Sequence, residues 1–210
     1  MSFVGTLRPL VKGNVTRPDR WPAVLLAAGF LATSTAVFAL VSALGAGLLG
    51  PWRSHPVSWV AAAVVLGLFL LADARLRTPM WRRQTPKRFL HRYGDRRAAL
   101  FWGLDAGLVG TTFRVTSLSW AALCLTLLGL VPWWAGVVYA LGFALPELAF
   151  DLVVPRRRVP AGEPDPEPTW VILGLLRARS VVRPVGLTVL ASAGVWSVVM
   201  ALAGRWPWLR

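Results

Sequence analysis

The sequence is poor in the residues that build redox and metal sites. It has one cysteine, Cys124, so an intrachain disulfide and a CxxC redox pair are both excluded. Its two histidines, His55 and His91, are far apart in the chain, which argues against a histidine-based metal site. No phosphate-binding loop and no nucleophile elbow is present. The sequence therefore predicts no cofactor, no metal site and no catalytic residue.

Acidic residues and lysine are also scarce. Nine acidic residues stand against 23 basic ones, of which only Lys12 and Lys87 are lysines, and the formal net charge is +14. In a soluble chain such a charge would suggest nucleic acid as the partner. Here the basic residues lie in gaps between apolar runs, which is typical of loops that face an anionic membrane leaflet. The expected partners are the lipid bilayer and its anionic lipid headgroups, and no nucleic acid.

Charge is missing altogether from a run of 29 residues, 22 to 50. As a straight helix this run would be about 44 Å long, against a hydrocarbon core of roughly 30 Å. The chain is 56% hydrophobic with a mean hydropathy of +0.57. One soluble domain of this length could not bury so much apolar surface. The sequence thus predicts membrane-spanning helices.

Five long, predominantly apolar runs predict an all-α, polytopic membrane bundle with five transmembrane helices. They cover residues 22–50, 57–74, 98–131, 135–154 and 184–204. The expected organisation is a basic cytoplasmic tail (1–20), a four-span core (21–154) with a basic cytoplasmic loop (75–97), a proline-rich loop and interfacial helix (155–183), and a last span with an outer tail (184–210).

Basic residues are distributed unevenly between the two sides of this arrangement. The segments placed inside carry 4, 9 and 6 lysines and arginines, and those placed outside carry 1, 0 and 2. This asymmetry predicts a protein of the plasma (cytoplasmic) membrane with its N-terminus inside and its C-terminus outside. The alternative is six spans, with residues 98–113 forming a separate one, but the arginines of 155–183 would then lie outside.

The two halves of the chain show a weak internal similarity. In each half a tryptophan leads to a Thr-Ser pair and then to a Pro-Trp pair: Trp21, Thr33-Ser34 and Pro51-Trp52; Trp102, Thr116-Ser117 and Pro132-Trp133. The pattern suggests a duplicated two-helix unit. The alternative is a chance match between helices rich in leucine, alanine and tryptophan.

Several polar side chains interrupt the apolar runs at similar depths. Counted from the outer end of each span, Asp73, Glu147, Asp151 and Arg114 lie roughly 18 to 25 Å deep. An unpaired charge is costly in hydrocarbon, so we expect Arg114 to meet a carboxylate there. Asp73 and Asp151 are expected mainly to mark the inner membrane boundary. The hypothetical substrate-binding residues are Glu147, Arg114, Asp105, Thr116, Ser117 and Thr33.

Asp105 and Arg114 cannot pair on one continuous helix, because nine residues place them about 180° and 13.5 Å apart. A break near Gly103, Gly107 or Gly110 would change that relation. The hydroxyl groups of this span can equally bond back to the helix or to a neighbouring helix. A second hypothetical site, for a partner or for lipid, is the basic loop with Arg82, Arg83, Lys87, Arg88 and Arg92.

The stretch WRRQTPKRFLHRYGDRRAALFWGLDAGLVGTTFRVTS resembles a pattern in small actinobacterial membrane proteins. These are distantly similar to the transmembrane cytochrome c biogenesis (thiol-disulfide transporter) and sulfite-exporter type families, and the resemblance covers about residues 81–145. Thiol-disulfide transfer would require paired membrane cysteines, which this chain lacks. The resemblance therefore implies solute translocation only.

Three functions remain open from the sequence. The leading hypothesis is a transporter-like protein that moves a small solute through a polar site between helices. The first alternative is a non-catalytic accessory or scaffold subunit that docks a membrane or cytoplasmic protein partner through the basic loop. The second is an intramembrane enzyme acting on a lipid or prenyl substrate, although no enzymatic signature supports it.

Overall fold

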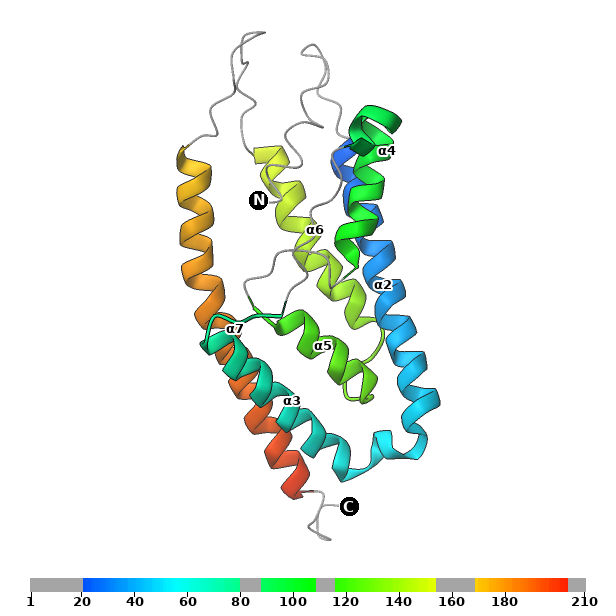
Figure 1. The fold of residues 1–210 in the computed structure, drawn as a ribbon, viewed down its shortest axis with the longest axis vertical. Coiled ribbons are helices and arrows are strands. Elements are labelled where there is room, and N and C mark those ends of the chain that lie inside the picture. Colours follow the sequence, from blue (N-terminus) through cyan, green and yellow to red (C-terminus); the bar gives the residue numbers. More distant parts are fainter. Residues whose placement is uncertain (1–20, 80–87, 109–115, 154–168, 204–210) are drawn as a thin grey trace.

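The structure is a computed structural model that describes residues 21–79, 88–108, 116–153 and 169–203. Within these ranges every long element is a helix and no strand occurs. The elements, shown in Figure 1, are α2 (Trp21–Leu49), the 3-10 helix η1 (Gly50–Ser54), α3 (Pro56–Ala74), α4 (Arg88–Gly107), α5 (Leu118–Leu127), α6 (Ala135–Val153) and α7 (Thr169–Ala203). The predicted all-α class is confirmed.

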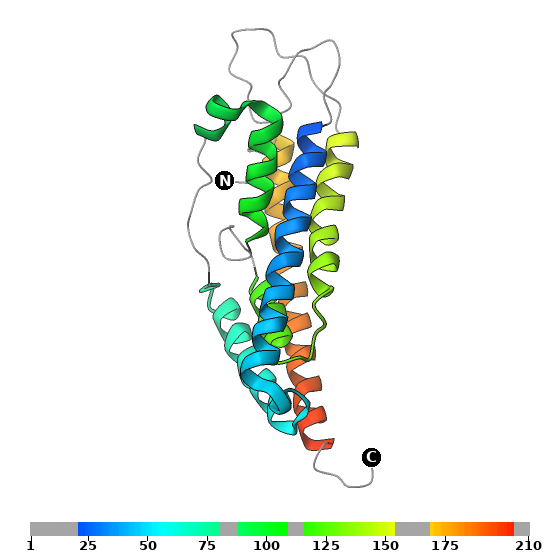
Figure 2. The same cartoon turned by 90° about the vertical axis from the view of Figure 1, so that its right-hand side faces the viewer.

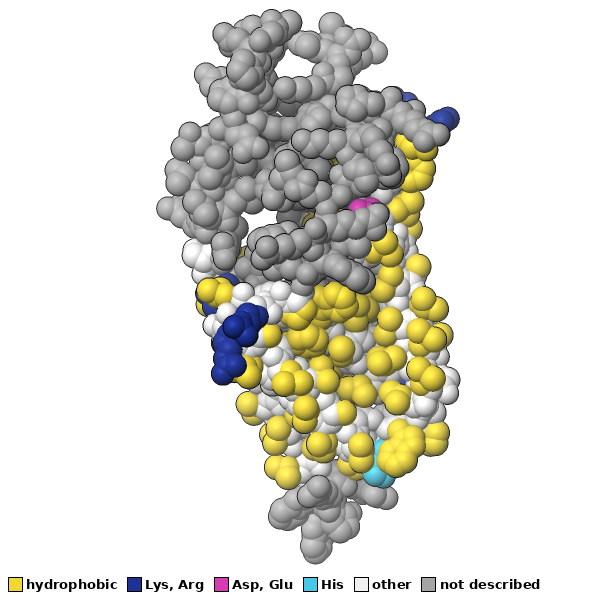
Figure 3. All heavy atoms as spheres, in the orientation of Figure 1, with side chains coloured by type: hydrophobic (Ala, Val, Ile, Leu, Met, Phe, Trp, Pro, Cys, Tyr) yellow, Lys and Arg dark blue, Asp and Glu magenta, His cyan; other side chains and the backbone are white. Residues whose placement is uncertain are grey.

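Three segments are long and apolar enough to cross a membrane. They are Trp21–Arg53, Pro56–Ala74 and Ser180–Ala203, and two shorter apolar stretches are Leu118–Leu127 and Ala135–Leu145. The surface along these segments is largely hydrophobic, as the lower half of Figure 3 shows. Exposing such a surface to water is energetically unfavourable, whereas contact with lipid tails is not. The fold is consistent with a multi-pass membrane protein.

The short helix α5 lies in the middle of the fold and connects two groups of helices. α2 packs against α4 and α6, whereas α3 packs against α7. α5 touches α2, α3 and α7, and Figures 1 and 2 both place it among the longer helices. With ten residues it is about 15 Å long, which is half of a hydrocarbon core.

Glycines allow α2 and α4 to approach closely. A Cβ added at Gly29 of α2 would lie 2.6 Å from the carbonyl oxygen of Leu100, and one added at Gly103 of α4 would collide with the carbonyl of Leu26. Gly107 follows Gly103 by one helical turn and faces Thr33 of α2. Small residues at this spacing bring two helix backbones together. Aromatic rings fill the adjoining core, where Phe30 stacks on Phe143 of α6 with centroids 4.0 Å apart.

Two elements differ from the sequence expectation. The region expected as one span (98–131) is divided, since α4 ends at Gly107 and α5 begins at Leu118. The region expected as an interfacial helix followed by a separate last span is one helix of 35 residues, α7, with Pro184 inside it. Proline removes one backbone hydrogen bond and kinks or ends many helices, but it does not end α7. α7 packs against α3, whose end is contacted by Arg183, the residue before Pro184.

Candidate functional site: a buried carboxylate at a helix break

Asp73 is a buried acid at the end of α3. Its side chain is 1% exposed. One carboxylate oxygen, Oδ2, accepts a hydrogen bond of 2.6 Å from the backbone N–H of Ser117. The other, Oδ1, accepts from the Ser117 hydroxyl at 2.6 Å and from the Thr78 hydroxyl at 2.8 Å. Three donors therefore offset the cost of removing this carboxylate from water.

The Thr78 hydroxyl reaches Asp73 because the chain reverses sharply after α3. Leu76 N–H donates to the carbonyl of Asp73, and Arg77 N–H donates to that of Ala72. This is the Schellman arrangement, which places Leu76 in the left-handed region with φ 58°. Glycine is the usual residue at this position, because a Cβ is strained there. The reversal also brings the carbonyl of Pro79 within 2.9 Å of the Trp120 indole nitrogen.

Arg183 of α7 lies over the same end of α3. Its Nη2 atom donates to the backbone carbonyl oxygens of Asp73 and Ala74, at 3.2 Å each. A cation at this position opposes the negative end of the α3 dipole. Its Nε atom is buried and has no hydrogen-bond partner among the described residues. The guanidinium therefore keeps unused donor capacity beside the buried carboxylate.

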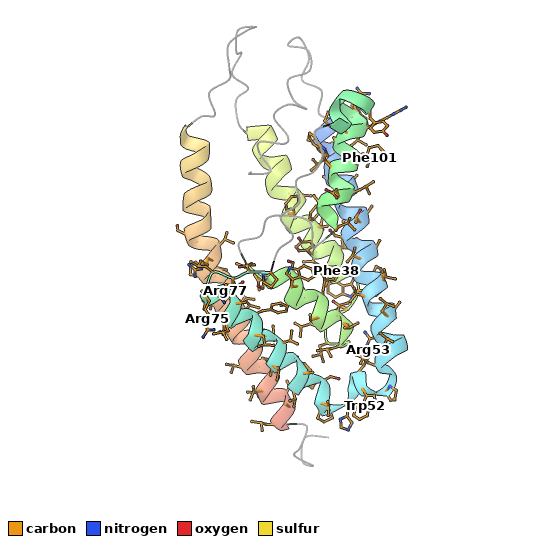
Figure 4. All side chains as sticks on the ribbon, in the orientation of Figure 1. Phe38, Trp52, Arg53, Arg75, Arg77 and Phe101 are labelled. Carbon is orange, nitrogen blue, oxygen red and sulfur yellow. The ribbon has the colours of Figure 1, made fainter. Side chains whose placement is uncertain are left out.

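The two ends of α5 meet charges of opposite sign, neither of which α5 itself supplies. Asp73 lies at its N-terminus, where Ser117 is the residue that precedes the helix. At its C-terminus, Arg53 Nη2 donates to the carbonyl of Thr126 at 3.1 Å, and Figure 4 shows Arg53 beside this end of α5. An anion at the N-terminus and a cation at the C-terminus both stabilise a helix dipole. α5 is thus fixed electrostatically at both ends.

Hydroxyl groups also line the other side of the helix break. Ser34 of α2 is fully buried, and its hydroxyl donates to the carbonyl of Gly107, the last residue of α4, at 3.4 Å. Thr116 lies against α7, where a Cβ added at Gly186 would be 2.5 Å from its Cγ2 atom. Thr35 on α2 has a buried hydroxyl oxygen with no hydrogen-bond partner among the described residues. A hydroxyl group of α2 therefore bonds to the end of α4, and Thr116 lies against α7 just before α5 begins.

The predicted substrate-site residues fall at several places. Ser117 bonds to Asp73, Thr116 packs on α7, and Thr33 packs on Gly107 at the end of α4. Asp105 is half-buried near the end of α4. Arg114 lies outside the described residues, and Glu147 belongs to α6 but its side chain is outside the described part. The structure thus places Ser117 in a polar contact and leaves the expected Arg114–carboxylate pair untested.

The predicted basic-loop site lies almost wholly outside the described residues. Arg82, Arg83 and Lys87 are outside them, and Arg88 and Arg92 belong to the first turns of α4 without described side chains. Sequence reasoning expected Asp73 mainly to mark the inner membrane boundary and did not include it among the site residues, whereas the structure shows it buried and bonded to Ser117. Asp73 and Ser117 are 44 residues apart in the chain, so no local sequence pattern predicts their contact.

Nothing in the described part of the chain resembles a metal centre, because no three His, Cys, Asp or Glu side chains come together there. Comparisons of the chain with protein-family models, with curated proteins and with solved structures each gave no match.

Proposed function

We propose that this protein is an integral membrane protein with five crossings, N-terminus inside and C-terminus outside, and that it moves a small solute through a polar site at the break between α4 and α5. The single observation that carries the proposal is the buried Asp73 carboxylate on the N-terminus of the half-length helix α5. The apolar segments and the distribution of arginines support the membrane location.

Broken helices have a recognised use in transporters. The N-terminus of a half-helix presents unpaired N–H groups and a partial positive charge near the middle of the membrane, where it binds anionic groups. In this chain Asp73, in the last turn of α3, lies at the N-terminus of α5 on the inner side of the proposed membrane arrangement, and the hydroxyls of Ser117 and Thr78 also donate to it. A solute that takes over these donors would displace Asp73, and next to it stands Arg183, which has no carboxylate partner among the described residues.

The surroundings of the break support the same proposal. Non-helical backbone at membrane depth is tolerated where protein buries it or where it lines an aqueous path. The hydroxyl of Ser34 bonds to the last residue of α4, and the hydroxyl-bearing residues Thr116 and Ser117 directly precede α5.

The topology is tested by labelling single cysteines in intact cells. In a Cys124→Ser background, cysteines at position 55, position 84 and position 210 are reacted with a membrane-impermeant maleimide. The proposal expects labelling at 55 and 210, and labelling at 84 only after the cells are opened. Labelling of position 84 in intact cells would overturn the arrangement.

The transport step is tested in proteoliposomes with a panel of labelled small anions, cations and neutral solutes. Wild type is expected to carry at least one solute faster than empty liposomes, and Asp73→Asn, Glu147→Gln and Arg114→Ala are each expected to abolish that flux in folded protein. Gly142→Ala is the control, because a Cβ at Gly142 meets nothing within 4 Å. Flux that survives Asp73→Asn, or a panel without any flux, contradicts the proposal.

An accessory subunit is the second candidate, and one observation favours it. Arg96 and Arg97 are exposed on α4, at the end of the basic segment 75–97. A docking role predicts that neutralising Arg82, Arg83, Lys87 and Arg88 together releases a co-purifying protein. An unchanged pull-down would count against that role.

A further inference from the structure

Three arginines gather where α3 ends beside α7. Arg75 and Arg77 follow directly after α3 and are exposed. Arg183 reaches the same end from α7 and bonds to the carbonyls of Asp73 and Ala74. Figure 4 shows Arg75 and Arg77 next to α7, and in Figure 3 a dark blue patch lies at the left edge, at about mid-height, beside hydrophobic side chains. We call Arg75, Arg77 and Arg183 the arginine cluster.

The cluster carries positive charge that no described side chain neutralises. Asp73, in the last turn of α3, is buried, and both of its carboxylate oxygens accept hydrogen bonds from Ser117 or Thr78. Within the described ranges neither Arg75 nor Arg77 forms an ion pair, and the buried Nε atom of Arg183 has no acceptor. An anionic group is the chemistry that fits three guanidinium groups placed in this way.

Apolar side chains border the cluster on the outer surface. Leu76, between the two exposed arginines, is 64% exposed, and on α7 the side chain of Val182, the residue before Arg183, is 46% exposed. The 19 residues of α3 make a helix of about 28 Å, close to the hydrocarbon thickness of roughly 30 Å. If α3 crosses the membrane, the cluster therefore lies at headgroup level with apolar surface directly below it.

We infer that the arginine cluster binds the phosphate headgroup of an anionic phospholipid, whose acyl chains lie along the exposed faces of α3 and α7. This inference rests on the membrane location proposed above. The cytoplasmic leaflet, on which the proposed topology places the cluster, is the leaflet rich in anionic lipids. A guanidinium group binds a phosphate through two parallel hydrogen bonds. This binding depends on where the arginines are placed, whereas a general electrostatic attraction to the membrane depends only on their charge.

The test measures lipid binding to the full-length protein in detergent by native mass spectrometry. Phosphatidylglycerol is titrated, and phosphatidylcholine serves as the neutral comparison. Arg75→Gln/Arg77→Gln is expected to weaken phosphatidylglycerol binding about thirtyfold, since each basic residue near a membrane surface contributes about 1 kcal/mol, or roughly fivefold. Phosphatidylcholine binding should not change.

The matched control is Arg96→Gln/Arg97→Gln, which removes the same charge from exposed positions on α4. It is expected to keep wild-type affinity for phosphatidylglycerol. Equal losses in both double variants, or a loss in neither, would overturn the inference. So would displacement of the lipid by millimolar inorganic phosphate, or selection of an acidic peptide over the lipid, because the acyl chains would then contribute nothing.

The same three proteins, wild type and the two double variants, test the lipid site separately from the proposed membrane location. Wild type and both variants are reconstituted into nanodiscs made of phosphatidylcholine with a minor fraction of phosphatidylglycerol. Failure of every form to insert would overturn the membrane location. If all forms insert but Arg75→Gln/Arg77→Gln binds phosphatidylglycerol as tightly as wild type, only the lipid site would be overturned.

Discussion

The carboxylate of Asp73 accepts hydrogen bonds from both the backbone N–H and the hydroxyl of Ser117, which lies 44 positions further along the chain. This contact joins the last turn of α3 to the first turn of α5. Arg53, just before α3, holds the opposite end of α5 through the carbonyl of Thr126. Arg53, just before α3, and Asp73, in its last turn, therefore fix the two ends of a helix that is too short to cross a bilayer alone.

Asp73→Asn removes the negative charge but keeps the shape of the side chain. We expect the free energy of unfolding to fall by about 1.5 to 3 kcal/mol, because hydrogen bonds to a buried charged group are lost or weakened. The measurement is equilibrium unfolding in detergent. Ser117→Ala, which keeps the backbone N–H donor, should cost less. Equal stability of Asp73→Asn and wild type would show that the charge does not stabilise α5.

Arg53→Gln removes the cation from the C-terminal end of α5. We expect backbone hydrogen exchange to accelerate in the last turn of α5, by a factor that corresponds to about 0.3 to 1 kcal/mol for a charge near a helix end. The first turn, which Asp73 holds, should exchange as in wild type. Asp73→Asn should give the reverse pattern. Acceleration along the whole helix in both variants would contradict separate stabilisation of the two ends.

Gly103→Ala places a methyl group against the backbone of Leu26. We expect a loss of about 1 to 3 kcal/mol, typical of overpacking, because a helix backbone cannot move aside as a flexible side chain can. The thermal unfolding midpoint in detergent is the measurement. Gly142→Ala on α6 is the control, since its added methyl group meets open space and alanine favours the helix. A Gly103→Ala protein as stable as the control would disprove the close contact of α2 and α4.

Leu76→Gly should stabilise the protein. The left-handed conformation costs a residue with a Cβ about 1 to 2 kcal/mol, and glycine avoids this cost while gaining some flexibility in the unfolded chain. We expect a net gain of about 0.5 to 1 kcal/mol in the free energy of unfolding. Leu76→Ala is the control, because alanine keeps the strain and removes only the exposed side chain. A gain in both variants would assign the effect to the leucine side chain and not to the backbone.

Local sequence patterns predicted most helix boundaries. The uncharged run at 22–50 corresponds to α2, and the apolar run at 57–74 corresponds to α3. Hydrophobic length sets these boundaries, and it is read within one segment. The division between α4 and α5 and the continuity of α7 through Pro184 were not predicted as such. The end of α4 and the start of α5 are held by hydrogen bonds from α2 and α3, which a segment considered alone does not reveal.

The sequence by itself determined that the chain is helical, that its apolar segments are long enough to cross a membrane, and that its arginines cluster between them. These properties depend on composition and on spacing within a segment. Only the tertiary structure decided that Asp73 faces Ser117, that Arg53 meets Thr126, and that Arg183 covers the end of α3. Each of these contacts joins residues at least 44 positions apart, and the physical reason for each is the orientation of one helix against another, which no local pattern encodes.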